Sequence, residues 1–344
     1  MDMIKINNEL SNILKSDFHT DQTELKKYHN SLLREIRKNS DNIKAYSLLG
    51  IIKLELSSKS NIILKYLKKA LDNKNITDKQ YAMLATNTAY ILITEPTDAN
   101  SPNEALKYLT EAIKRNSAYP ETYYGLGMYF YKNKDIKNAI KFLQQATELS
   151  NNEKYAKSYA SCLITDKQYD DALQYITLIN EESLKLFLTA VIKFYTNDFT
   201  KTKQLLDNIN ESDYTYYSYE IAKLYLAIGE YQKFTDIIDN ENYYFDKELA
   251  HYYSYSMNKL RQSEKAYEKL HLIINETEEI IADTNIEDFE KKKEYTDFIK
   301  TVKNEINEII EGFSMKNSKP IYTFDFQPDT DCYYIGCPRH SNIL

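Results

Sequence analysis

The sequence predicts an all-α fold, a right-handed α-α superhelix of about seven stacked helical hairpins. Two in-phase series of small residues support this prediction, because self-similarity at a period of 30 to 40 residues is typical of repeat proteins. The first series is Gly50, Ala89, Gly127, Ala160, Ala190, Ala222 and Ser254. The second, which Phe234 interrupts, is Ala105, Ala139, Ala172, Thr202 and Ala266. The 344 residues include only 6 glycines and 6 prolines, so few tight turns or sheet edges are expected.

Composition excludes several classes of protein. The net charge of −7 comes without a basic cluster, so we expect no nucleic-acid partner. No apolar run is long enough to cross a bilayer, and the first residues lack the apolar core of a signal peptide. Three cysteines do not make a disulfide framework. A soluble, cytoplasmic protein without membrane association is therefore expected.

The clearest hairpin covers residues 120–150. Pro120 suits a first helical turn, and a polar break follows at residues 132–135. The apolar positions at helical spacing are Tyr123, Leu126, Gly127 and Phe130, then Ala139, Leu143 and Ala146. Gly127 and Ala139 fall where the two antiparallel helices would cross, and small side chains there let the two backbones approach each other closely.

These seven positions resemble the tetratricopeptide repeat, a 34-residue helix–turn–helix unit. Ala105, Leu109 and Ala112 close the preceding unit in the same way, after an insertion at residues 95–102. The later units diverge from the pattern, but the resemblance extends over residues 41–275. It implies a protein or peptide partner, held in a groove that the first helix of each hairpin lines.

The two ends of the chain depart from the repeat. Residues 4–15 and 21–38 predict two helices, and we assign residues 1–40 to an N-terminal cap, which stacked repeats need. Residues 276–313 predict a C-terminal amphipathic helix with Ile299, Val302, Ile306, Ile309 and Phe313 at 3-4-3-4 spacing. This helix either closes the solenoid or dimerises as a coiled coil, so both a monomer and a homodimer remain open.

The last segment, residues 314–344, has a different character. Residues 319–328 alternate apolar and polar side chains between prolines, as in an extended segment. Three interpretations of the Cys-containing end compete: aromatic side chains that dock on the last helices, an internal ligand that blocks the groove, or a metal site. Cys332, Cys337 and His340 are weak candidates for metal ligands, because a structural zinc site commonly has four ligands and a closer Cys pair. We therefore expect no cofactor.

No nucleotide-binding glycine loop, His-Glu-x-x-His motif or nucleophile elbow occurs, so we do not expect an enzyme. The resemblance places the partner-binding face on Tyr124, Met128, Tyr131, Lys157, Ser161, Phe187, Phe194, Tyr216, Tyr219 and Lys223. Met128 and Ser161 stand where the family's carboxylate-clamping members carry Asn, so that specificity is not matched. The predicted function is a binding scaffold for a peptide or an extended protein segment. The alternatives are a bacterial receptor for a short signalling peptide and an accessory protein with a metal-binding tail.

Overall fold

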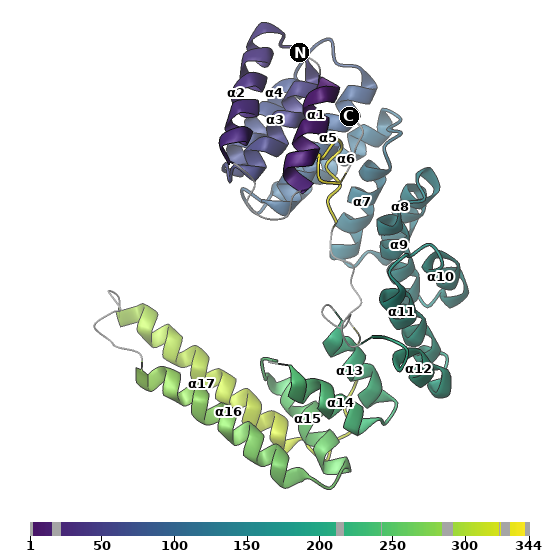
Figure 1. Cartoon of the computed structure of the whole chain (residues 1–344), viewed down its shortest axis with the longest axis vertical. Helices are drawn as coiled ribbons and strands as arrows, with labels where there is room; N and C mark the ends of the chain where they lie inside the picture. The colour runs from purple at the N-terminus through teal and green to yellow at the C-terminus, as the bar shows by residue number, and fades with distance from the viewer. Residues whose placement is uncertain are drawn as a thin grey trace. The chain divides into compact units, whose positions relative to one another are not determined.

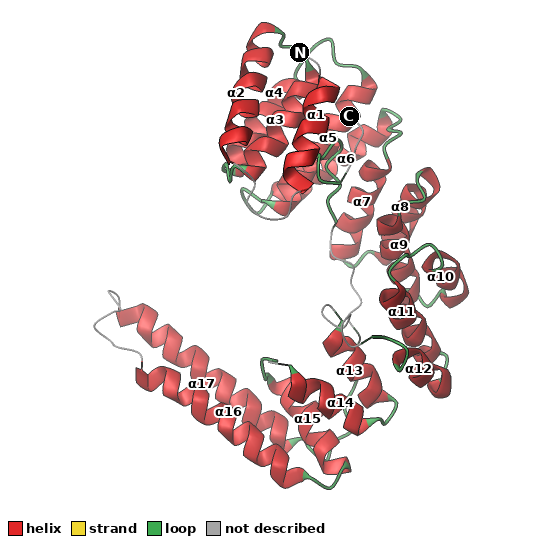
Figure 2. Ribbon diagram, in the orientation of Figure 1, coloured by secondary structure: helices red, strands yellow, loops and turns green. Residues whose placement is uncertain are grey.

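A computed structural model describes residues 3–15, 22–210, 217–241, 243–283, 292–322, 324 and 331–340. These residues form 17 helices and no strand, which confirms the predicted all-α fold (Figures 1 and 2). None of these helices is both apolar enough and long enough to span a bilayer. The chain divides into two compact units: unit 1 contains residues 1–180 and 327–344, and unit 2 contains residues 181–326.

Unit 1 starts with two helices that precede the repeats, as the sequence predicts, and continues with four hairpins. The two leading helices are α1 (Met3–Lys15) and α2 (Gln22–Lys38). The hairpins are α3 (Ile43–Glu55) with α4 (Ser60–Leu71), α5 (Asp78–Thr94) with α6 (Ser101–Lys114), α7 (Pro120–Lys132) with α8 (Ile136–Leu149), and α9 (Glu153–Thr165) with α10 (Tyr169–Ile176). Helix α6 begins at Ser101, so the inserted loop is two residues shorter than the predicted residues 95–102.

Unit 2 contains three further hairpins and one additional helix. The hairpins are α11 (Glu182–Tyr195) with α12 (Phe199–Leu206), α13 (Ser218–Ala227) with α14 (Tyr231–Asn240), and α15 (Lys247–Lys259) with α16 (Ser263–Asp283). The last helix, α17 (Lys292–Ser314), packs against α15 and α16. Residues 276–283 were expected to open the C-terminal helix, but they form the last turns of α16. The apolar stripe at Val302 and Ile309 faces inward from α17, where both side chains are buried.

The small residues lie where the hairpin model requires them. All members of both series are buried, and Phe234, which breaks the second series, is buried as well. A Cβ atom added to Gly127 would lie 2.6 Å from Cγ of Leu143, so α7 and α8 are in direct contact at this glycine. In unit 2, Thr202 Oγ1 lies 3.5 Å from the carbonyl oxygen of Ala190, which brings together the two series in one hairpin.

The hairpin turns share a backbone feature that the sequence pattern does not reveal. In six of the seven hairpins, a residue with positive φ follows the first helix: Ser57, Lys134, Lys167, Asn197, Gly229 and Arg261. After α7, the amide of Lys134 donates to the carbonyl of Tyr131, and the amide of Asp135 donates to that of Phe130. This pair of bonds is the Schellman arrangement, which normally favours glycine at the left-handed position. Only Gly229 follows that preference, so five non-glycine residues hide the turns from sequence analysis.

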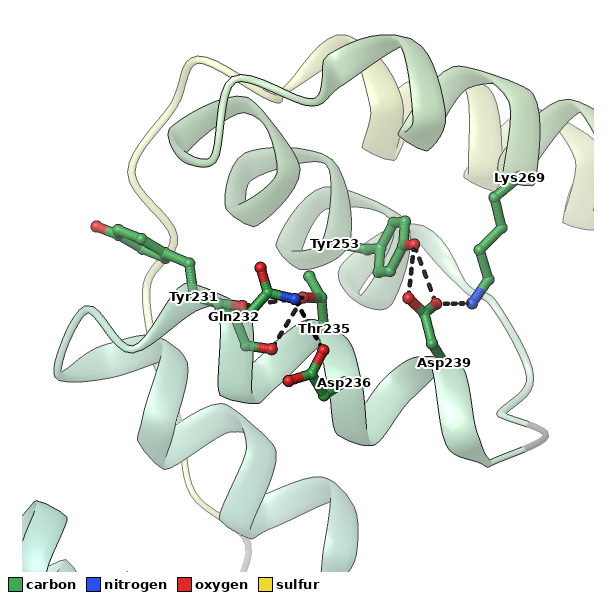
Figure 3. Close-up of polar contacts among 7 residues, drawn as sticks. All are labelled: Tyr231, Gln232, Thr235, Asp236, Asp239, Tyr253 and Lys269. Carbon is green, nitrogen blue, oxygen red and sulfur yellow. Dashed lines mark hydrogen bonds and ion pairs between the residues drawn. The ribbon is translucent and has the colours of Figure 1, made fainter.

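A polar network joins the last two hairpins of unit 2 (Figure 3). The carboxylate of Asp239, on α14, accepts hydrogen bonds from the Tyr253 hydroxyl at 3.0 and 3.3 Å and pairs with the Lys269 ammonium. Lys269 Nζ also lies 4.8 Å from the centroid of the Tyr253 ring. Burial and the neighbouring Asp239 carboxylate raise the pKa of Tyr253. One acidic side chain therefore links α14 to both helices of the following hairpin.

Substituting Gly127 with leucine should destabilise unit 1. The new side chain would collide with Leu143 and wedge α7 from α8, at a cost on the order of 1–3 kcal/mol. The measurement is the free energy of unfolding by urea, followed by circular dichroism. Gln144→Leu, at an exposed position of α8, is the matched control and should unfold like the wild type. Equal free energies of unfolding for Gly127→Leu and the wild type would contradict the close crossing of α7 and α8.

Candidate functional site

The C-terminal segment of residues 331–340, here called the tail, lies on the first helices of the unit 1 hairpins. It contacts α3, α5, α7 and α9, and in Figure 1 the yellow trace runs beside α5 and α7. Tyr334, Ile335 and Cys337 belong to the same hydrophobic core as residues of the first three hairpins. We call the surface under the tail the first-helix face. This position agrees with the internal-ligand interpretation and excludes docking of these aromatics on the last helices.

Two consecutive turns shape the tail. The amide of Cys337 donates to the carbonyl of Tyr334 at 3.1 Å, and Gly336 at the third position has a φ of +76°. A type II turn requires this left-handed conformation, which glycine adopts without strain. The amide of His340 then donates to the carbonyl of Cys337 at 3.2 Å, with Pro338 at the second position, where proline is favoured. The local sequence therefore encodes the bend of the tail.

Two glycines create the space for the tail's adjacent tyrosine rings. A Cβ atom on Gly50 of α3 would lie 2.3 Å from the Tyr334 hydroxyl oxygen. A Cβ atom on Gly125 of α7 would lie 2.7 Å from Cε2 of Tyr333. Tyr333 is 0% exposed and Tyr334 is 2% exposed, so both rings are completely enclosed. Burial of an aromatic side chain contributes on the order of 1.5–3 kcal/mol, which makes the pair the main apolar anchor of the tail.

Aromatic side chains of the repeats surround the two rings. Tyr90 of α5 packs edge-on against Tyr333 at 5.1 Å and against Tyr334 at 5.9 Å between ring centroids. Tyr124 of α7 approaches Tyr333 at 6.1 Å and Tyr155 of α9 at 5.3 Å. Edge-to-face contacts of this kind add about 0.5–1.5 kcal/mol to simple burial. The first-helix face therefore holds a continuous aromatic cluster from α5 to α9.

Polar side chains of the first-helix face bind the main chain of the tail. The Asn87 amide group contacts both polar atoms of one residue: its Oδ1 accepts from the Ile335 amide at 2.6 Å, and its Nδ2 donates to the Ile335 carbonyl at 3.0 Å. Lys154 Nζ donates to the carbonyl of Cys332 at 2.8 Å. The Tyr124 hydroxyl accepts from the Asp331 amide at 3.1 Å. These bonds do not depend on the side chains of the bound segment.

Two side chains of the tail, those of Tyr334 and Arg339, make further polar contacts. The Tyr334 hydroxyl donates to the main-chain carbonyl of Ser47 at 2.7 Å, deep in the face. Arg339 forms a bidentate pair with the Glu55 carboxylate, at 2.8 Å for each bond, and its Nη1 donates to the carbonyl of Leu14. The Tyr333 hydroxyl, in contrast, is buried without a hydrogen-bond partner among the described residues. Leaving such a group unsatisfied costs about 1–3 kcal/mol.

The electrostatics of the site follow from burial. Desolvation lowers the pKa of Lys154, although the nearby Glu121 carboxylate opposes the shift. Desolvation also raises the pKa of Tyr90. The hydrogen bond between the two tail cysteines lowers the pKa of Cys332 and raises that of Cys337, and His340 adds to the lowering at Cys332.

The predicted partner-binding residues of unit 1 occupy different environments. Tyr124 contacts the tail directly, whereas Met128, Tyr131 and Ser161 are buried. Lys157 is half-buried, one turn after the contacting Lys154. Tyr124 is also buried, at 0% exposed, and yet contacts the tail, so burial does not decide whether Met128, Tyr131 and Ser161 contact a partner. Their assignment as partner contacts stays a prediction.

In unit 2, several predicted residues contact other parts of the chain. Phe187 stacks on Tyr217 at 5.2 Å, and Phe194 packs edge-on against Phe324 at 5.2 Å. Lys223 pairs with Glu220 at 2.7 Å and lies over the Tyr219 ring. Tyr216 lies outside the described residues.

The segment before the tail also follows a first helix. His251 Nε2 lies 2.8 Å from the carbonyl of Ser318, and the Tyr252 hydroxyl donates to the carbonyl of Ile321 at 2.9 Å. Asn258 Nδ2 lies 3.1 Å from Oδ1 of Asn317. Residues 317–321 thus extend along α15 within unit 2. In both units, C-terminal residues lie against the helices that the resemblance assigns to partner binding.

Most residues that hold the tail were not predicted from the sequence: Ser47, Glu55, Asn87, Tyr90, Gly125 and Lys154. One signal was available, because Asn87 is a polar side chain between Ala85 and Ala89 in an otherwise apolar helix. Such a side chain must find a hydrogen-bond partner when it is buried. Gly125 gave a second signal, since Gly127 alone is enough for the helix crossing.

Known proteins that are similar to the chain include a curated relative and two solved structures. No family model matches the chain. Interferon-induced protein with tetratricopeptide repeats 2 from Cricetulus griseus is 25% identical over 171 residues, which are 49% of this chain. The match spans only 33% of that relative's length.

Two solved structures of tetratricopeptide proteins are similar to the chain. One is YrrB, described as a TPR protein with an unusual peptide-binding site, at 19% identity and a TM-score of 0.45, covering 54% of this chain and 94% of YrrB. The other is the P58(IPK) TPR domain, at 14% identity and a TM-score of 0.26, covering 92% of this chain and 98% of that domain.

Replacing Asn87 with alanine should loosen the tail while unit 1 remains folded. The Ile335 amide would lose its acceptor, at a cost of about 1–3 kcal/mol, so its hydrogen exchange should accelerate roughly 5- to 150-fold. Exchange mass spectrometry of the peptide that contains residues 333–337 measures this change. Asn103→Ala, on the exposed side of α6, is the control. If the Ile335 amide were equally protected from exchange in Asn87→Ala, Asn87 would not hold the main chain of the tail.

Proposed function

We propose that this tetratricopeptide-like repeat protein is a binding scaffold for an extended peptide segment. The partner would occupy the first-helix face of unit 1, and the tail would cover that face until the partner displaces it. The observation that carries the proposal is the bidentate contact of Asn87 with the main chain of Ile335. Every peptide carries a main-chain amide and carbonyl, so this contact transfers to another segment that adopts the same turn.

Specificity would come from the two ring sites. Gly50 and Gly125 leave room for adjacent aromatic side chains, and Tyr90 packs against both rings. The Glu55 carboxylate, which binds Arg339 in a bidentate pair, would favour a basic residue after the aromatic pair. The proposed partner therefore carries aromatic residues at the two positions that correspond to Tyr333 and Tyr334. It carries a basic residue at the position that corresponds to Arg339. A receptor for a short signalling peptide, the alternative from the sequence, would use this same face.

The docked tail combines favourable contacts with one unfavourable one, so a better-matched partner would displace it. Its two rings and its main-chain bonds favour docking, but the Tyr333 hydroxyl is buried without a partner, which opposes docking by about 1–3 kcal/mol. A partner segment with phenylalanine at this position would avoid that cost. At the neighbouring site the Tyr334 hydroxyl favours docking, because it donates a hydrogen bond to the Ser47 carbonyl. The face should therefore prefer Phe-Tyr over the tail's own Tyr-Tyr.

Opening the face should allow a peptide to bind in trans. The full-length variant Tyr333→Ala/Tyr334→Ala removes both anchors of the tail without shortening the chain. A fluorescein-labelled peptide of residues 331–340 should bind this variant and not the wild type, as measured by fluorescence anisotropy. Adding Tyr124→Ala to the open variant should weaken binding, whereas Tyr267→Ala, at an exposed position of α16, should not. Failure of a folded open variant to bind the peptide would contradict the proposal.

Exchanging each tyrosine of the peptide for phenylalanine should shift affinity in opposite directions. The substitution at position 333 removes an unsatisfied hydroxyl and should tighten binding about tenfold. The same substitution at position 334 removes a hydrogen bond and should weaken binding roughly 2- to 10-fold. Competition against the labelled peptide measures both. Equal or reversed effects would show that the peptide does not bind as the tail does.

A further inference from the structure

Three soft or borderline donor groups meet in the tail. The Sγ atoms of Cys332 and Cys337 and a ring nitrogen of His340 all lie within 4.8 Å of one another. The sequence spacing alone gave only weak support for a metal site, because four residues separate the two cysteines. The structure changes this assessment. The type II turn at Gly336 and the following turn at Pro338 bring the three side chains to one point.

The spacing of Cys337 Sγ and His340 Nδ1 fits a tetrahedral zinc site. Zinc binds Cys sulfur at about 2.3 Å and His nitrogen at about 2.0–2.1 Å, so ligand atoms lie about 3.8 Å apart for two sulfurs and about 3.5 Å for sulfur and nitrogen. Cys337 Sγ and His340 Nδ1 are 3.5 Å apart. All three cysteines of the chain are free thiols, so neither tail sulfur is used in a disulfide.

The surroundings of the cluster suit a bound cation with one open position. Cys337 is buried and Cys332 half-buried, while His340 is exposed and gives an ion access from solvent. Lys154 Nζ lies beside the cluster, through its 2.8 Å hydrogen bond to the Cys332 carbonyl. Two thiolates and one neutral imidazole would leave the complex with Zn²⁺ uncharged, which suits a largely buried position.

We propose that Cys332, Cys337 and His340 bind one Zn²⁺ ion through two Sγ atoms and Nδ1, with the fourth position open to water. The ion would cross-link the two ends of the turn that carries Tyr333 and Tyr334. It would thereby hold both rings in the arrangement that fits the first-helix face. This consequence rests on the proposed function, whereas the metal site does not.

The direct test is metal content and spectroscopy of the full-length protein. After reduction and dialysis against zinc, elemental analysis should find one zinc per chain. Substitution with Co²⁺ should give the thiolate charge-transfer bands of a tetrahedral sulfur site. Cys332→Ser and Cys337→Ser should each lose the ion, and His340→Ala should weaken its binding at least tenfold.

Matched variants separate this site from general thiol or imidazole binding. Cys162→Ala removes the third cysteine, and His271→Ala removes an exposed histidine of α16. Both should keep one zinc per chain. The site is overturned if the reduced protein takes up no zinc, if the Cys332→Ser variant binds as much as the wild type, or if the two tail cysteines form a disulfide that reduction opens without zinc uptake.

A second readout tests the effect of the ion on the tail. Removing zinc with a chelator should at least double the hydrogen-exchange rate of the Ile335 amide, and Cys332→Ser should behave like the metal-free protein. If zinc bound without any change in that exchange rate, the ion would not hold the two tyrosine rings in their docked arrangement. Measured in the presence of a chelator, peptide binding to the open variant involves no zinc, so it separates failure of the zinc site from failure of the proposed function.

Discussion

Close approach to the backbone of the first helices is the constraint on which the structure of unit 1 depends. Two neighbours approach the backbone of α7 closely, on two different sides of the helix. Gly127 lets α8 approach through Leu143, and Gly125 lets the tail approach through Tyr333. A methyl group at either glycine would collide with its neighbour. The same helix therefore builds the hairpin with one glycine and the first-helix face with another.

In the proposed function, main-chain recognition lets one surface hold its own tail or a separate partner. Asn87, Lys154 and Tyr124 bind amide and carbonyl groups, which every peptide carries. The proposed selection among peptides would come from the ring sites, through shape and hydroxyl content. Because the tail satisfies one hydroxyl and leaves the other unpaired, its docking is favourable without being optimal. A covalently attached segment needs little affinity, since it is always present at high local concentration.

The hairpin architecture was predictable because the relevant contacts are local in sequence. Gly127 and Leu143 are 16 residues apart, and the recurring small residues report such crossings directly. Helix boundaries also followed local rules, as at Pro120 of α7. The turns with positive φ were hidden because residues such as Lys134 occupy positions that usually hold glycine.

The site was far less predictable, for a physical reason. Asn87 and Ile335 are 248 positions apart, and no periodicity reports a contact between a repeat and a unique segment. Of the predicted face, Tyr124, Met128 and Ser161 are all buried, and Tyr124 contacts the tail. Periodicity identifies which helix faces a neighbour but does not distinguish a partner from the next repeat.

The most direct test of the account is the distance between Tyr333 and α7 in solution. In a sample with selectively labelled glycine, a nuclear Overhauser cross-peak should connect the α protons of Gly125 to aromatic ring protons. This cross-peak should disappear in Tyr333→Leu, while the glycine signal itself remains. A Gly125 resonance without any aromatic cross-peak in the wild type would show that the tail does not occupy the first-helix face.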